Sequence, residues 1–193
     1  MSKSKKNIYK DIINKGRKLI VTKGSSELTA RKLAKETGYS VGTIYNNFDN
    51  LDNYITIQNM QTLEELYDIL NKNKQSKNNF EKINCFLDTY ITFIENNKNL
   101  WELLFNFHNK LDRKIKFSYK KRIYNIYNIL AEDICTLLKN KSSKSLRKTS
   151  FIIATSIFTN SSFLLQNNKI DDLNKNNKYL LNTYLAGLIA IKK

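Results

Sequence analysis

The chain of 193 residues contains no proline, only five glycines and a single histidine. Proline and glycine are the residues that most often interrupt regular structure, so their scarcity favours long helices. One histidine leaves little for His-rich metal sites or for general acid-base chemistry. We therefore expect neither a metal ion nor a cofactor.

Motifs typical of common enzymes are also missing. The sequence has no G-x-S-x-G and no Gly-rich phosphate loop. Adjacent carboxylates diverge on a helix and suit a solvated face rather than a catalytic pair. Three such pairs occur: Glu64 and Glu65, Glu132 and Asp133, and Asp171 and Asp172. We expect no enzymatic activity.

The two cysteines, Cys85 and Cys135, lie far apart and belong to no CxxC or CxxH cluster. This spacing argues against structural zinc and against a disulfide framework. Both lie in apolar-periodic surroundings, where free cysteines commonly pack as small hydrophobes. A redox-sensing thiol is the alternative interpretation.

Long hydrophobic runs are lacking as well. The longest nearly apolar stretch, Phe151 to Phe158, is far shorter than the roughly 20 residues that a bilayer requires. The first residues, MSKSKKNIYKDII, have neither an apolar h-region nor a small-residue cleavage site. We expect a cytoplasmic protein that does not associate with a membrane.

Positive charge is abundant and concentrated near the N-terminus. The net charge is +16, and residues 1–48 carry eleven Lys or Arg against three acidic residues, a net +8. A/T-rich codons alone would enrich the whole chain in Lys, Asn, Ile and Tyr. A local concentration of charge instead suits a phosphate-binding surface.

Hydrophobic periodicity predicts an all-α protein. Apolar residues recur at spacings of three and four, which is the signal of amphipathic helices. The first helix has an apolar inner face and ends at Gly24, and Asn50 is placed to cap the fourth. We predict nine helices and no sheet, over about residues 7–22, 29–37, 41–47, 51–70, 80–96, 100–108, 114–139, 146–166 and 173–191.

The segment LTARKLAKETGYSVGTIYNNF, residues 28–48, predicts a helix-turn-helix. A glycine permits the tight turn, a serine can cap the second helix, and apolar residues give both helices an inner face. The residues concerned are Leu33, Ala34, Gly38, Ser40, Ile44 and Phe48.

This segment resembles the N-terminal domain of the TetR/AcrR family of transcription regulators. The family pattern is matched by Thr29, Ala34, Gly38, Ser40, Gly42, Thr43, Ile44, Tyr45 and Phe48. The resemblance implies a three-helix DNA-binding domain (1–50) and a helical ligand-sensing and dimerisation domain (51–193). It also implies a homodimeric, sequence-specific regulator, expected to be a repressor that a small-molecule effector releases from double-stranded operator DNA.

Two positions depart from the family pattern. Asn47 stands where the family often has a histidine, and Leu51 stands where it often has a lysine. That lysine would contact a phosphate. Without it, the contact falls to the N-terminal amides of the fourth helix, near Asn50.

The candidate DNA-binding residues follow from this arrangement, in which the second short helix enters the major groove. Its outward side chains meet base edges, and the start of the preceding helix meets phosphates, as would Lys3, Lys5 and Lys6. The candidates are Thr29, Arg31, Lys32, Ser40, Val41, Gly42, Thr43, Tyr45, Asn46 and Asn47.

The resemblance also places a ligand cavity in the aromatic middle of the chain and a dimer interface on the last two helices. An ordinary core is the alternative for both sets. The ligand candidates are Phe86, Tyr90, Trp101, Phe105, His108 and Tyr124. The interface candidates are Phe151, Phe158, Leu165, Tyr184 and Leu188, beside other apolar residues that include Ile152 and Phe163.

A rival function is a basic interaction protein that binds nucleic acid or an anionic surface without sequence specificity. Such a protein would bind independently of DNA sequence and of changes at Thr43 or Tyr45. Sensitivity to those two residues therefore separates the two interpretations.

Overall fold

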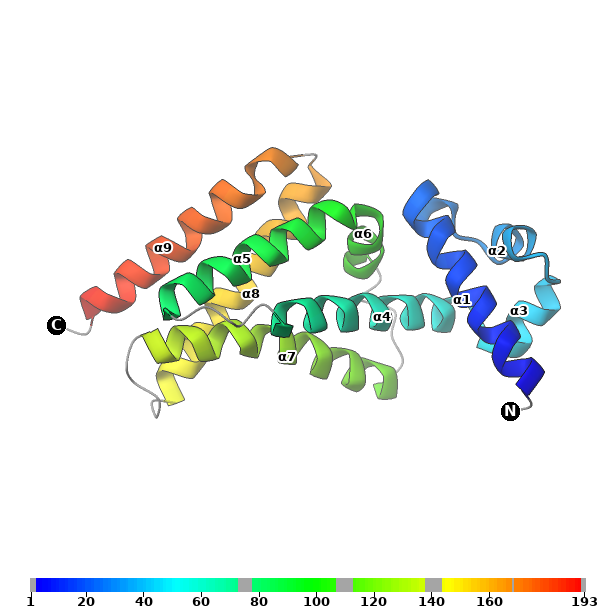
Figure 1. Cartoon of the computed structure of the whole chain (residues 1–193), viewed down its shortest axis with the longest axis horizontal. Helices are drawn as coiled ribbons and strands as arrows, with labels where there is room; N and C mark the ends of the chain where they lie inside the picture. Colours follow the sequence, from blue (N-terminus) through cyan, green and yellow to red (C-terminus); the bar gives the residue numbers. More distant parts are fainter. Residues whose placement is uncertain (1–2, 73–77, 107–112, 138–143, 168, 192–193) are drawn as a thin grey trace. The chain divides into compact units, whose positions relative to one another are not determined.

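The computed structural model describes residues 3–72, 78–106, 113–137, 144–167 and 169–191. Over these residues the chain forms nine α-helices, two short 3₁₀-helices and no strand (Figure 1), which confirms the predicted all-α class. Within these ranges no helix combines the length and the hydropathy that a membrane span requires. The elements are α1 (Lys3–Lys23), η1 (Ser25–Glu27), α2 (Ala30–Thr37), α3 (Val41–Phe48), α4 (Leu51–Lys72), α5 (Asn79–Asn96), α6 (Lys98–Asn106), α7 (Arg113–Leu137), α8 (Lys144–Gln166), η2 (Ile170–Asp172) and α9 (Leu173–Ile191).

The backbone contacts divide the chain into two compact units. Unit 1 comprises Met1–Thr62 and Asn97–Phe117, and unit 2 comprises Leu63–Asn96 and Ser118–Lys193. Each unit therefore draws on two separate stretches of sequence. The functional border predicted between residues 50 and 51 is a different division and stays a prediction.

Two of the helix ends near the N-terminus follow the predicted chemistry, whereas the left-handed conformation predicted for Gly24 is wrong. Gly24 has a positive φ of 85°, but its ψ of 169° is extended rather than left-handed helical. Gly38 has φ 78° and ψ 11°, the left-handed conformation that a glycine adopts without steric cost. The Asn50 side chain accepts a hydrogen bond from the Asn53 N–H at 2.8 Å, which confirms the predicted cap of α4.

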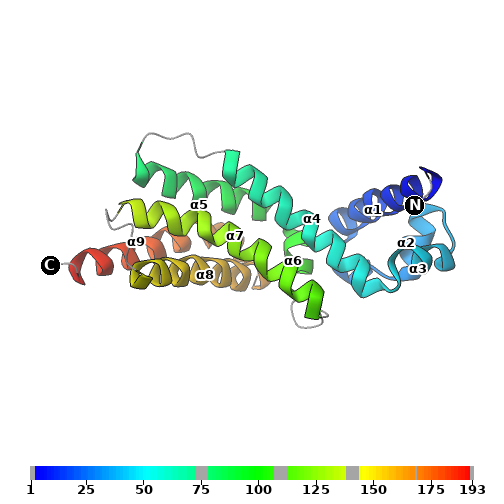
Figure 2. The ribbon, with the colours of Figure 1, turned by 90° about the horizontal axis from the view of Figure 1, so that it is seen from below.

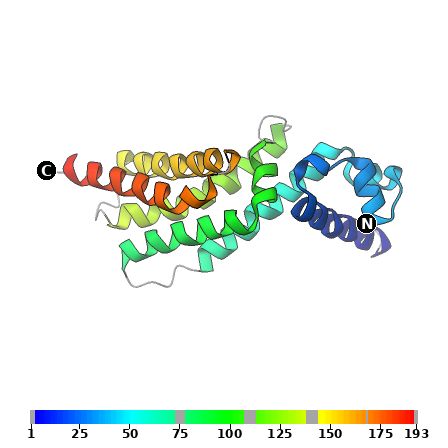
Figure 3. The ribbon, with the colours of Figure 1, turned by 90° about the horizontal axis from the view of Figure 1, so that it is seen from above.

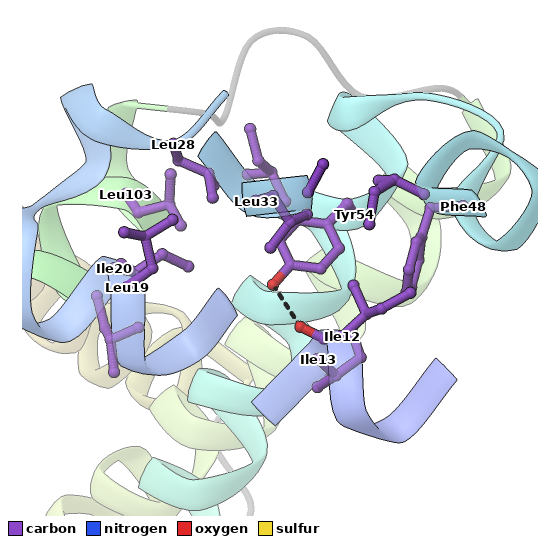
Figure 4. Packing of buried hydrophobic residues seen from close by; sticks show 13 residues of the cluster. Ile12, Ile13, Leu19, Ile20, Leu28, Leu33, Phe48, Tyr54 and Leu103 are labelled. Carbon is purple, nitrogen blue, oxygen red and sulfur yellow. Dashed lines mark hydrogen bonds between the residues drawn. The ribbon is translucent and has the colours of Figure 1, made fainter. Parts of the chain in front are cut away.

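Unit 1 is built around one apolar cluster to which α1, α2, α3, α4 and α6 contribute. Figure 4 shows the side chains of these helices converging, with the Tyr54 hydroxyl donating to the Ile12 carbonyl at 3.3 Å. Burial of this apolar surface is the main stabilising contribution to the unit. The cluster comprises Ile12, Ile13, Leu19, Ile20, Leu28, Leu33, Ala34, Ile44, Phe48, Tyr54, Ile55, Leu100 and Leu103.

A hydrogen-bonded seam fastens α4 to α1. The Gln58 side-chain amide donates to the Ile13 carbonyl at 2.9 Å and to the Tyr54 hydroxyl at 2.8 Å. The Arg17 guanidinium donates to the Thr62 hydroxyl at 3.1 Å. The Tyr54, Gln58 and Thr62 side chains are therefore paired, so their burial costs little and they fix one alignment of the two helices.

Unit 2 is a helical bundle in which α9 packs against α5 and α8. Figures 2 and 3 show α8 and α9 side by side and running in opposite directions. A buried polar network joins them: Asn160 donates to the Asn177 side-chain oxygen at 2.8 Å, and Asn177 donates to the Ser161 hydroxyl at 2.7 Å. Burial raises the pKa of Tyr90, on α5, well above its ordinary value, so this phenol stays protonated.

Gly16 lies where α1 meets α4. A Cβ at this position would collide with the Tyr54 hydroxyl and with a methyl group of Leu33, both of which belong to the buried cluster. We expect Gly16→Ala to lower the free energy of unfolding by about 1–3 kcal/mol, because overpacking forces the core to shift. Urea unfolding followed by circular dichroism measures the change.

Gly42→Ala is the matched control, because the nearest atom to a Cβ there is the Ser40 hydroxyl at 3.7 Å, an ordinary contact. Alanine in this helical position is expected to leave stability unchanged or to raise it by up to about 1 kcal/mol. Equal losses in both variants would contradict the close approach at Gly16.

Candidate nucleic-acid interface

Two side-chain caps and one glycine define the helix-turn-helix. The Thr29 hydroxyl accepts from the Lys32 N–H at 3.1 Å, and the Ser40 hydroxyl accepts from the Thr43 N–H at 3.0 Å. Between them, the Gly38 N–H donates to the Ala34 carbonyl at 2.9 Å and ends α2. The cap predicted at Ser40 and the turn predicted at Gly38 are confirmed.

The inner face of α3 fixes its orientation within unit 1. Ile44 is completely buried and Phe48 is 2% exposed, as predicted. The Phe48 ring stacks on Tyr9 of α1 with centroids 4.8 Å apart and meets Tyr54 of α4 edge-on at 5.0 Å. Aromatic contacts on two sides therefore hold the end of α3.

The opposite face of α3 is open to solvent. Ser40, Gly42 and Asn46 are exposed, and the Tyr45 side chain is 43% exposed. Thr43 is partly exposed, and its hydroxyl lies 2.9 Å from that of Ser40. This face thus presents a phenol, an amide and two hydroxyls, the groups that bind base edges and phosphates.

Two candidates on α3 are partly engaged by the protein itself. Val41 packs against the unit 1 cluster, which leaves only part of its side chain available for a thymine methyl. The Asn47 amide donates to the Thr43 carbonyl at 2.8 Å, while its own oxygen is buried and has no hydrogen-bond partner in the described part of the chain. Asn47 therefore faces its own helix more than solvent.

The start of α2 carries one lysine that is ion-paired and one arginine that is not, within the part of the chain that the structure describes. Thr29, Arg31 and Lys32 are all exposed. The Lys32 ammonium forms an ion pair with Glu27, and this pairing lowers the pKa of Glu27. Arg31 has no ion-pair partner within the described residues. Of the two cations, its guanidinium is therefore the more available to pair with an anion.

The start of α4 carries acidic side chains. Asp49 precedes the helix, where it has an unusual φ of 61°, and Asp52 lies in the first turn. Leu51, where a lysine would be expected from the family pattern, packs partly against the unit 1 cluster. Two carboxylates oppose a phosphate at this helix N-terminus, an effect that the sequence interpretation missed.

The ligand candidates do not form one group. Trp101 is completely buried and Phe105 partly buried in unit 1, whereas Phe86 and Tyr90 are buried in unit 2. Tyr124, also in unit 2, is 52% exposed. His108 lies outside the described residues.

The interface candidates pack mainly within unit 2. The rings of Phe151 and Phe158 both meet Tyr127 edge-on, with centroids 5.6 Å and 5.5 Å apart. Leu165 is buried, and the Tyr184 hydroxyl lies 3.5 Å from that of Ser156. The side chain of Leu188 lies outside the described residues.

Comparison of the sequence with known proteins points to the same segment. The model of a family described as bacterial regulatory proteins, tetR family, matches residues 12–52, from the middle of α1 to the start of α4. A search of curated proteins finds no match.

Comparison of the fold extends over almost the whole chain. FadR from Bacillus subtilis, in complex with stearoyl-CoA, superposes with a TM-score of 0.72 at 16% identity, covering 93% of this chain and 98% of that one. FadR from Bacillus halodurans gives 0.71 at 16% identity, covering 94% and 96%. A tetR-family transcriptional regulator from Streptomyces coelicolor gives 0.72 at 11% identity, covering 97% and 84%. The predicted TetR-like fold is confirmed.

The Ser40 cap is testable apart from any ligand. Ser40→Ala leaves the Thr43 N–H without its side-chain partner, so we expect the free energy of unfolding to fall by about 1 kcal/mol. Urea unfolding measures it. Ser26→Ala, at an exposed serine of η1, should stay within about 0.5 kcal/mol of the parent; a similar loss there would contradict the specific role of Ser40.

Proposed function

We propose that the chain is a DNA-binding transcription regulator of the TetR family, as the family match over residues 12–52 supports, and that α3 binds the major groove of a specific operator. The observation that carries this proposal is the two-sided character of α3. Ile44 and Phe48 anchor it in unit 1, while Tyr45 and its neighbours face solvent. A groove about 12 Å wide admits such a helix with its outward side chains against the bases.

Each outward side chain has a role that its chemistry suits. The Asn46 amide can donate and accept at once, which matches adenine, and Thr43 can donate to or accept from either base type. Tyr45 presents a phenol that suits a phosphate oxygen, and Gly42 lets the helix approach the DNA backbone closely. Base contacts by Thr43 and Asn46 would provide the specificity.

Phosphate contacts fall to the basic N-terminal region. Arg31 is exposed at the start of α2, and Lys6 and Lys10 are exposed on α1. Guanidinium and ammonium groups neutralise phosphates and release counterions, which gives affinity without sequence preference. Acidic Asp49 and Asp52 make the start of α4 a poor anchor, so we assign no phosphate contact there.

We also propose a homodimer, because one helix-turn-helix contacts too few base pairs for useful specificity. The outer face of α8 carries a stripe at helical spacing: Ile152, Ser156, Thr159 and Phe163, of which Ile152 is 47% and Phe163 60% exposed. The Ser156 and Thr159 hydroxyls donate to carbonyls of their own helix at 2.9 Å. They can therefore be buried against a second helix without losing hydrogen bonds.

We propose that the protein represses transcription and that a small, partly apolar effector relieves this repression. The protein is proposed to act in the cytoplasm. The FadR structure from Bacillus subtilis holds stearoyl-CoA, which supports ligand binding on a fold of this kind. An effector that binds one conformation more tightly than another changes operator affinity by population shift.

Tyr45 provides the test of DNA recognition. Operators are first selected from random DNA with the purified protein, and affinity is then measured by fluorescence anisotropy. We expect Tyr45→Ala to weaken operator binding by at least about tenfold, since a lost hydrogen bond to a charged group is worth about 1.5–3 kcal/mol. Unchanged binding, or no sequence enriched from the random DNA, would instead indicate non-specific binding of a basic protein.

Two further variants separate the phosphate contacts from effects that any substitution in the protein could have on DNA binding. Arg31→Gln should weaken binding similarly for all sequences and reduce the salt dependence by about one released ion. Tyr67→Phe, at a partly exposed tyrosine of unit 2, should leave binding unchanged.

Phe163 provides the test of dimerisation. We expect Phe163→Glu to weaken self-association by at least about 30-fold, because an aromatic side chain that the proposed dimer would bury is replaced by a charge. Sedimentation velocity measures the change. Phe117→Glu is the control, since Phe117 is 73% exposed but lies on α7 in unit 1. A dimer that Phe117→Glu dissociates and Phe163→Glu leaves intact would contradict the α8 interface.

A further inference from the structure

A pocket of about 460 Å³ lies between α7 and α8 in unit 2. This volume falls in the usual range for sites that bind small molecules. Of the five sequence-predicted ligand residues that the structure describes, only Tyr124 is part of its lining. The pocket is therefore distinct from the buried aromatic positions of α5 and α6.

The apolar part of the pocket is an aromatic corner. The rings of Tyr124 and Phe151 lie 5.4 Å apart at an angle of 36°, and Phe151 is supported from behind by its edge-on contact with Tyr127. Ala131 and the nearly buried Cys135 continue the apolar lining along the same face of α7. A flat ring of a ligand fits such a surface, because the contact with Tyr127 holds Phe151 in place and the half-exposed ring of Tyr124 is accessible to the ligand.

The polar part of the pocket carries a carboxylate and an ammonium group. Glu132 already accepts a hydrogen bond from the Asn128 amide at 2.7 Å. Lys148, across the pocket on α8, is exposed and forms no ion pair with any described residue. The Glu132 carboxylate keeps its negative charge but is already bonded to an amide of its own helix, whereas the Lys148 ammonium has no ion-pair partner among the described residues and can receive an anion.

We propose that this pocket binds an aromatic carboxylate, with the ring against Tyr124 and Phe151 and the carboxylate at Lys148. The large positive charge of the chain favours the same sign of ligand. Binding itself stands on the pocket alone. The claim that such an acid is the effector rests on the proposed function.

Calorimetric titration of the full chain with naphthoate tests the pocket, with naphthalenemethanol of the same ring position as an uncharged control. We expect naphthoate to bind once per chain and the alcohol at least about tenfold more weakly. Lys148→Gln should remove most of that difference, whereas Tyr124→Ser should weaken both compounds alike. Lys120→Gln, an exposed lysine elsewhere on α7, should change neither.

Absence of naphthoate binding at millimolar concentration, or binding that Lys148→Gln leaves unchanged, would overturn the site. Operator affinity is then measured with the pocket saturated. A change that Lys148→Gln abolishes supports the effector role, and no change overturns that role alone. Failure of the protein to bind any operator overturns the proposed function but leaves the titration result standing.

Discussion

The contact between Tyr54 and α1 at Gly16 is the constraint on which the proposed DNA-binding surface depends. Without a side chain at Gly16, the Tyr54 ring can lie against α1, and its hydroxyl reaches the Ile12 carbonyl. The other edge of the ring meets Phe48, the last residue of α3. The position of α3 is thus set by a chain of contacts that begins at a glycine two helices away, and each contact in it is buried and therefore hard to deform.

Some polar side chains on the outward face of α3 stabilise the helix itself, and others remain available to a binding partner. Ser40, Thr43 and Asn47 hydrogen-bond to backbone atoms or to each other and so stabilise a helix of only eight residues. Short polar side chains that bond locally are less free to bond a partner. Tyr45 and Asn46 carry no such duty in the described structure and remain the most available groups. The division explains how so short a helix can be both firmly held and chemically exposed.

The sequence predicted this region well because its signals are local. Caps at Ser40 and Asn50 and the turn at Gly38 depend on neighbouring residues alone, and the apolar spacing of Ile44 and Phe48 identifies the inner face. Long-range features were not predictable in this way. Gly16 resembles any helical glycine until Tyr54 is placed beside it, and the aromatic spacing around Tyr124 could not distinguish a pocket wall from a core.

The discontinuous make-up of unit 1 bears on how the recognition module can be inherited or transplanted. Leu100 and Leu103, on α6, complete the cluster that α1 to α4 begin, and the Asn99 amide donates to the Val21 carbonyl at 2.8 Å. An N-terminal piece that stops after Thr62 would leave this part of the cluster uncovered and exposed to water. Under the proposed recognition by α3, DNA specificity would be exchanged between related chains by replacing the outward residues of α3 and keeping the rest of unit 1 unchanged.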